Sequence, residues 1–124
     1  MINTFFVFVG GGLGATARYW SSGTVYRWAE STFQYGTITV NVIGCFVIGF
    51  LMTSLEERFL AAPALRVFLT IGILGGFTTF STFSFETIRM VEDTQFQHAV
   101  VNIGTTVAAS LSATYIGTQL GRIV

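Results

Sequence analysis

The sequence predicts an all-α integral membrane protein, because charges are scarce and are separated by long uncharged runs. Charged residues make up 10% of the 124 residues and hydrophobic residues 52%, whereas an ordinary soluble domain carries about 25% charged residues. The six basic residues, all arginine, balance six acidic residues, so the formal net charge is zero. These twelve charges are too few to cover the surface of a soluble domain.

The same composition excludes several classes of function. Electrostatic binding to nucleic acid requires a basic patch, so this neutral chain without lysine is expected to have no nucleic-acid partner. The single cysteine, Cys45, excludes a disulfide framework within the chain and a multi-cysteine metal site. The uncharged runs contain no nucleophile paired with a base and no pair of carboxylates, so we expect no enzymatic activity.

Four uncharged runs divide the chain at residues 1–17, 31–55, 67–85 and 94–121. About 20 apolar residues cross a bilayer as a helix, so each run supplies one span. Allowing for fraying and interfacial residues, we place the spans at 3–22, 37–55, 66–88 and 97–119. The proline at position 63 can start the third helix without breaking a span. The short links leave no room for another domain, so residues 1–124 are expected to form one membrane domain.

The arginines give almost no orientation to these spans. Four spans would place both termini and the second link on one side, with Arg58, Arg66 and Arg122. The other side would hold Arg27 and Arg89, with Arg18 near it. Such a flat count leaves two interpretations under the positive-inside rule. Either a small excess of arginine on one side is enough to orient the chain, or the chain inserts in both orientations and pairs as an antiparallel dimer.

Small residues recur at four-residue spacing in three of the expected spans. The pairs and rows are Gly10 and Gly14; Gly72 and Gly76; Gly104, Ala108 and Ser112; and Ala113, Gly117 and Gly121. Such faces allow helices in lipid to approach closely. Because four short helices enclose little space by themselves, we also expect an oligomer.

Small or polar residues also follow four-residue steps inside two spans. The second span carries Thr37, Asn41, Cys45 and Gly49, and the fourth carries His98, Asn102, Thr106, Ser110, Thr114 and Thr118. A single threonine can bond its own helix carbonyl, but this explains an unbroken row poorly. Uncharged donors suit conduction, which requires binding weak enough for the ion to leave.

The third span carries the segment GGFTTFSTFS from Gly75 to Ser84. Its two glycines and two β-branched threonines lie mid-span, so we expect a broken helix near the bilayer midplane. Free carbonyls facing a dimer axis would make a cation site there. Phe80 and Phe83 are three apart and share a face, where their positive ring edges could meet an anion. Core packing is the alternative for either ring.

The end of the first span combines one arginine with several aromatic residues. Arg18 lies roughly 23 Å along a helix begun at Asn3, where it could concentrate anions at a vestibule. An ordinary anchor at the end of a span is the alternative. The aromatic residues flanking the first loop, as expected at a membrane interface, are Tyr19, Trp20, Tyr26, Trp28 and Tyr35.

Three segments resemble signatures of the CrcB/Fluc family of fluoride channels. They are GGFTTFSTFSFE from Gly75 to Glu86, GTITVNVIGCFVIG from Gly36 to Gly49, and GGLGATARYW from Gly11 to Trp20. The resemblance covers the whole chain in length, span count and motif order. It implies a dual-topology antiparallel homodimer in the bacterial inner membrane, with two pores that export cytoplasmic fluoride passively and so reduce its toxicity.

The resemblance also implies roles for individual residues. A structural sodium ion at the dimer interface would be held by backbone carbonyls of Gly75 and Thr78. The fluoride pore would be lined by Asn41, Thr79, Phe80, Ser81, Thr82 and Phe83. Arg18 would lie at the vestibule, and a polar track would contain Asn102, Thr106 and Ser110. Glu86 ends the motif and either acts on the ion or only pairs with Arg89.

Other functions fit the sequence less well. A small dual-topology multidrug exporter needs a carboxylate inside the membrane, typically in the first span, and residues 1–17 contain none. A non-transporting assembly subunit would explain the small-residue faces, but it leaves the polar rows and the broken span without a purpose. Proton-coupled fluoride exchange is disfavoured because no Glu or His lies at mid-membrane.

Overall fold

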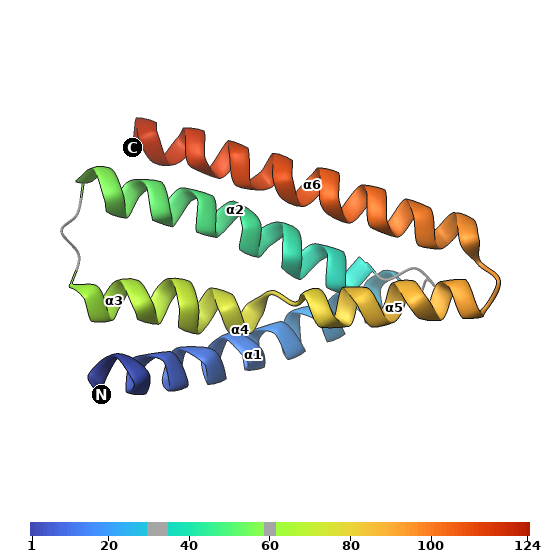
Figure 1. The fold of residues 1–124 in the computed structure, drawn as a ribbon, viewed down its shortest axis with the longest axis horizontal. Coiled ribbons are helices and arrows are strands. Elements are labelled where there is room, and N and C mark those ends of the chain that lie inside the picture. Colours follow the sequence, from blue (N-terminus) through green and yellow to red (C-terminus); the bar gives the residue numbers. More distant parts are fainter. Residues whose placement is uncertain (30–34, 59–61) are drawn as a thin grey trace.

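The computed structural model describes residues 1–29, 35–58 and 62–124 (Figure 1). All regular structure in these ranges is helical: α1 (Ile2–Ala29), α2 (Tyr35–Arg58), α3 (Pro63–Val67), the π-helix η1 (Phe68–Leu74), α4 (Gly75–Phe77), α5 (Phe80–Glu92) and α6 (Phe96–Ile123). The segments from α3 to α5 follow one another along one interrupted rod beside the continuous α1, α2 and α6 (Figure 1). Both termini lie at the end of the bundle where α2 ends and α3 begins (Figure 1).

Three helical stretches are long and apolar enough to cross a membrane. They are Tyr35–Glu56, Pro63–Glu92 and Phe96–Ile123. With 28 residues α1 also has the necessary length, but its glycines and Arg18 make it less apolar than the other three. The fold is therefore that of an all-α, multi-pass membrane protein.

Each helical rod contains one expected span and extends past it. The first span was placed at 3–22, and α1 continues to Ala29. The third was placed at 66–88, and its rod runs from Pro63, which begins α3 in its first turn, to Glu92. The rods are longer because a charged residue ends an apolar run without ending the helix.

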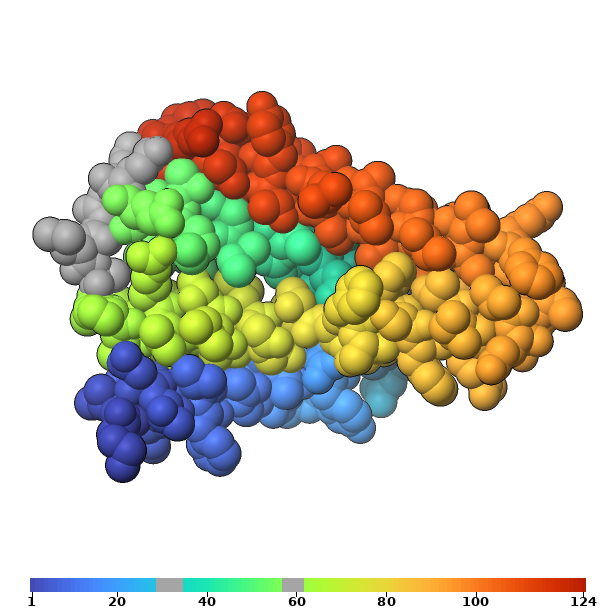
Figure 2. Space-filling model, in the orientation of Figure 1, coloured from blue at the N-terminus to red at the C-terminus, as the bar shows by residue number. Residues whose placement is uncertain are grey.

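Glycines set how closely the rods pack, with α2 beside α6 and α1 beside η1 and α4 (Figure 2). A Cβ on Gly10 would lie 3.0 Å from the Gly72 Cα, and one on Gly14 would collide with the Ile73 carbonyl. The two predicted glycine pairs therefore face one another across α1 and the interrupted rod. Gly117 packs in the same way against the Phe46 carbonyl of α2, whereas nothing lies within 4 Å of Gly104.

The third rod breaks at two threonines and not at the preceding glycines. Thr78 (φ −86°, ψ 156°) and Thr79 (φ −152°, ψ 117°) are extended, whereas Gly75 is helical at φ −62°, ψ −37°. The expected break is therefore present within the predicted segment, and the two threonines form it. Gly76 stays helical because it packs on α1, where an added Cβ would lie 2.5 Å from the Gly11 carbonyl oxygen. The threonines unwind more readily because β-branched side chains favour extended backbone.

Candidate functional site

The unwound backbone at Thr79 is held by one side chain, the amide of Asn41 on α2. The Asn41 Nδ2 donates to the Thr79 carbonyl at 3.0 Å, and the Thr79 N–H donates to Asn41 Oδ1 at 2.8 Å. An extended residue inside a helical bundle has no helical partners, so this amide satisfies both of its backbone groups. Asn41 is 8% exposed and keeps one amide hydrogen without a hydrogen-bond acceptor in the described residues.

Hydroxyl groups gather where α5 begins. Thr79 Oγ1 caps the helix by accepting the Thr82 N–H at 3.1 Å, and it also lies 3.1 Å from the hydroxyls of Ser81 and Thr82. The N-terminus of a helix is the positive end of its dipole. The expected pore residues Thr79, Ser81 and Thr82 therefore come together at a helix end that favours an anion.

The break also leaves backbone carbonyls without helical donors. In a continuous helix the Thr79 and Thr82 amides would bond to the Gly75 and Thr78 carbonyls, but here they donate to side-chain oxygens. Within the described ranges no backbone N–H donates to either carbonyl. Carbonyl oxygens are ligands that hard cations accept. Gly75 and Thr78, the residues expected to hold sodium, therefore fit such an ion in the chemistry of their donors.

A cavity of about 250 Å³ lies beside the break, between α2, α5 and α6. Its lining residues are Asn41, Cys45, Thr78, Thr79, Phe80, Phe83, Thr106, Val107 and Ser110, and it is called the aromatic cavity below. The ring centroids of Phe80 and Phe83 are 5.4 Å apart and the rings are inclined by 49°. Phe83 is 8% exposed and Phe80 is 78% exposed, so the ring pair is covered from one side only.

The α6 wall of the aromatic cavity carries two unpaired hydroxyls. Thr106 Oγ1 and Ser110 Oγ are buried and have no hydrogen-bond partner in the part of the chain that the structure describes. Buried polar groups are almost always hydrogen-bonded, so these two hydroxyls indicate a place for a water molecule or an ion. Both belong to the polar track expected from the sequence.

Asn102, the remaining residue of the expected track, lies outside the aromatic cavity. It is 1% exposed and does not line the aromatic cavity. Its Nδ2 donates to the Thr87 Oγ1 at 2.9 Å, and its Oδ1 has no partner in the described residues. A row at four-residue spacing drifts around the helix, so only part of it can share one environment. Of the expected track, Thr106 and Ser110 reach the cavity.

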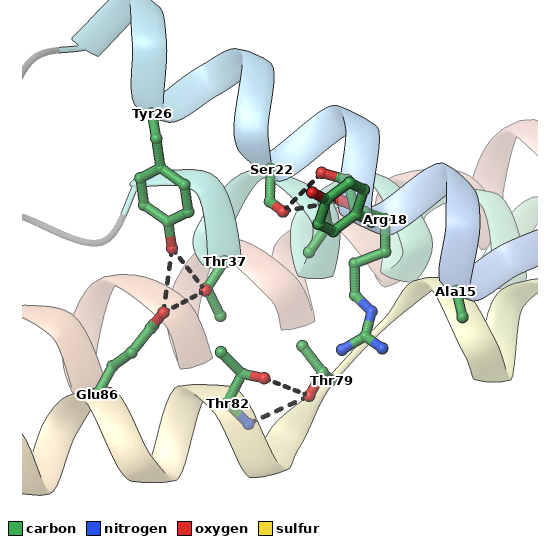
Figure 3. Close-up of a pocket in the computed structure, with 10 residues that line it drawn as sticks. Ala15, Arg18, Ser22, Tyr26, Thr37, Thr79, Thr82 and Glu86 are labelled. Atoms are coloured by element: carbon green, nitrogen blue, oxygen red, sulfur yellow. Dashed lines mark hydrogen bonds between the residues drawn. The ribbon is translucent and has the colours of Figure 1, made fainter.

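A second cavity, of about 340 Å³, lies on the other side of the break and is called the arginine cavity below (Figure 3). It is lined by Ala15, Arg18, Tyr19, Ser22, Tyr26, Thr37, Val40, Thr79, Thr82 and Glu86. Figure 3 shows the Arg18 guanidinium reaching from α1 toward Thr79. No described residue forms a hydrogen bond or an ion pair with that guanidinium. Arg18 was expected near the end of the first helix, but α1 continues to Ala29.

Glu86 lies across the arginine cavity from Arg18, where two hydroxyls hold it (Figure 3). Its Oε1 accepts from the Tyr26 hydroxyl at 3.0 Å and from the Thr37 hydroxyl at 2.8 Å. Its Oε2 is buried without a partner among the described residues. The expected alternative of a pair with Arg89 is absent from the described ranges. The sequence indicates a membrane-interface position for Tyr26, and no spacing along the chain links this residue to Glu86.

Comparison with known proteins gives matches along almost the whole chain. Residues 5–118 match the family model described as CrcB-like protein, Camphor Resistance (CrcB). A protein of Geotalea daltonii named fluoride-specific ion channel FluC is 45% identical over 124 residues, which is 100% of both chains. Proteins of the same name from Citrifermentans bemidjiense and Geobacter metallireducens are each 47% identical over 112 residues, or 90% of each chain.

Proposed function

The chain belongs to the CrcB family, and from this membership we propose that it is a fluoride channel that exports cytoplasmic fluoride across the bacterial inner membrane. A relative named fluoride-specific ion channel matches the chain over its full length. One structural observation carries the proposal furthest. In the aromatic cavity, two unpaired hydroxyls, two phenylalanine rings and the start of a helix converge.

The chemistry of the aromatic cavity suits a small anion in transit. Fluoride leaves water only where other donors replace its hydration shell, and Thr106, Ser110 and the remaining Asn41 amide hydrogen are such donors. The edges of the Phe80 and Phe83 rings add positive potential. No Lys, Arg or His lines this cavity in the described residues. Binding is therefore weak enough for the ion to move on.

The two cavities mark a path past the break. Thr79 lines both of them, so the arginine cavity and the aromatic cavity meet at this residue. The free guanidinium of Arg18 raises the local anion concentration. Tyr26 and Thr37 hold Glu86 on the opposite wall, which keeps its negative charge away from the guanidinium.

Two copies of the chain are proposed to pair antiparallel, with two pores in the dimer. Phe80 is 78% exposed in the single chain, so a second copy is needed to enclose the ring pair. The row of Gly104, Ala108 and Ser112 is also exposed and supplies a face for close packing. The flat arginine count fits insertion in both directions.

Sodium is proposed as a structural ion at the dimer interface. The Gly75 and Thr78 carbonyls lack helical donors, and Gly75 is exposed on the face open to a second copy. Bound there, the ion would supply the positive charge that these carbonyl dipoles require. The pore residues of each chain do not depend on the ion for their own hydrogen bonds.

Passive export suffices because of the acid chemistry of fluoride. Hydrogen fluoride crosses membranes as a neutral molecule, dissociates in a less acidic cytoplasm and is trapped there as the anion. An inside-negative membrane potential then drives the anion out through a selective channel. No carboxylate pair or catalytic base is needed, in agreement with a family whose named members are channels.

Efflux from liposomes tests the proposal. The purified protein is reconstituted with internal potassium fluoride, and a fluoride electrode records release with and without a potassium ionophore; chloride release is measured in parallel. We expect fast fluoride loss only with the ionophore and retention of chloride. No fluoride release from a folded dimer would refute the channel and favour a drug exporter or an assembly subunit.

A further inference from the structure

The half-helix α5 carries both phenylalanines of the aromatic cavity, but it is separated from α4 by the break. Because Thr78 and Thr79 are extended, the direction of α4 does not determine the direction of α5. The position of α5 must therefore be set by side chains from neighbouring helices. At its start this is done by Asn41, which holds Thr79 from α2.

A second asparagine reaches α5 from α6. Asn102 Nδ2 donates to the Thr87 Oγ1 at 2.9 Å, and the Thr87 hydroxyl donates in turn to the Phe83 carbonyl at 2.7 Å. All three residues are buried, with 1%, 7% and 8% of their surface exposed. Buried hydrogen bonds in series rigidify the segments that they join. These bonds therefore connect α6 to the backbone of Phe83, whose ring lines the aromatic cavity.

Asn102 has no direct access to that cavity. The cavity lining begins on α6 at Thr106, one turn further along, and excludes Asn102. Its amide nitrogen donates to Thr87, which orients the amide toward α5. Its unpaired Oδ1 is an acceptor and would repel an anion.

We propose that Asn102 is a positioning residue: through Thr87 it fixes how far the Phe83 ring projects into the aromatic cavity, and thereby sets the preference for fluoride over larger halides. This inference rests on the proposed channel function. It removes Asn102 from the polar track and leaves Thr106 and Ser110 as the α6 residues that meet the ion.

A double-mutant cycle tests the connection. Asn102→Ala and Thr87→Val each break the relay, the two hydrogen bonds that join Asn102 through Thr87 to the Phe83 carbonyl. Each substitution is expected to reduce the fluoride-to-chloride efflux ratio about tenfold, the factor that corresponds to the free energy of one buried hydrogen bond. Residues that act through one another are non-additive, so the double variant should be no worse than either single variant. Thr87→Ser keeps the hydroxyl and should keep the ratio. Additive losses would overturn the inference.

A spectroscopic measurement separates this inference from the channel function. With 4-fluorophenylalanine at position 83, Asn102→Ala and Thr87→Val should shift the ¹⁹F resonance alike, and Thr87→Ser should leave it in place. A resonance that moves with Thr87→Val but not with Asn102→Ala would refute the relay. Should Asn102→Ala not fold, Asn102→Ser makes the same test. If the wild-type protein released no fluoride, the channel proposal would fail. The ¹⁹F resonance would still show whether Asn102 acts on Phe83 through Thr87.

Discussion

At the scale of single residues, the structure explains why an asparagine stands beside a pair of threonines. The sequence placed Asn41 in a polar row, from its four-residue spacing with Thr37 and Cys45. It could not reveal that Asn41 bonds to Thr79, because spacing along a helix carries no information on a partner 38 positions away. The same limit hid the bonds from Tyr26 and Thr37 to Glu86.

Replacing Asn41 with alanine should destabilise the break. The Thr79 N–H and carbonyl would lose their partners, at a cost of about 1–3 kcal/mol for each unsatisfied group. We expect a lower midpoint of thermal unfolding in detergent together with reduced fluoride efflux. Asn3→Ala, at an exposed position, is the control and should change neither. An unchanged midpoint for Asn41→Ala would show that the amide does not support the unwound backbone.

Thr106 and its neighbour Thr105 form a matched pair on α6. Thr106 is 7% exposed and lines the aromatic cavity, whereas Thr105 is exposed on another face. Thr106→Val removes a donor to a charged ion and should slow fluoride efflux by about tenfold or more. Thr105→Val should leave efflux unchanged. Equal effects of the two substitutions would place the ion path elsewhere.

At the scale of helical elements, local propensity predicted where the third helix is weak but not which residues would unwind. Glycines and threonines both weaken a helix, and the sequence alone does not rank them. Packing decides the outcome: Gly76 is held helical against α1, and Thr79 is held extended by Asn41. The helix ends were placed too early for a different reason, since the spans were drawn from uncharged runs, whereas α1 continues past residue 22 and through Arg27 to Ala29.

Glycine packing between α1 and the interrupted rod gives a prediction with an internal control. A Cβ on Gly14 would collide with the Ile73 carbonyl, and nothing lies within 4 Å of Gly12. Gly14→Ala should therefore lower the free energy of unfolding by about 1–3 kcal/mol, the usual cost of overpacking. Gly12→Ala should be neutral or slightly stabilising, because alanine is the better helix former. Thermal unfolding in detergent compares the two, and equal stability would contradict the packing of these rods.

At the scale of the whole molecule, the single chain leaves open the surfaces that are proposed to meet fluoride and sodium. The Phe80 ring is exposed and the Gly75 and Thr78 carbonyls lack donors. The all-helical membrane fold is predictable from composition, because scarce charge and long apolar runs are properties of the whole chain. An interface between copies depends on surface shape, so the arginine count leaves an antiparallel dimer as one of two interpretations, and only the family resemblance implies it.

Removal of sodium tests the structural ion. A ligand that binds only the folded state stabilises it by about 2.7 kcal/mol at a concentration one hundred times its dissociation constant. Exchanging sodium for N-methylglucamine should therefore lower the thermal midpoint of the purified dimer, and sodium should restore it. Potassium at the same concentration is the control for ionic strength. A midpoint indifferent to sodium would rule out the proposed site.

The reversal potential of the current in a planar bilayer tests passive, selective fluoride conduction most directly. With a fluoride gradient across the membrane and an opposing chloride gradient, we expect a current that reverses at the equilibrium potential of fluoride. A pH gradient should not move that potential, because no proton is coupled. A reversal potential that follows chloride would show that the channel does not select fluoride, and one that shifts with pH would show that protons are coupled to the transport.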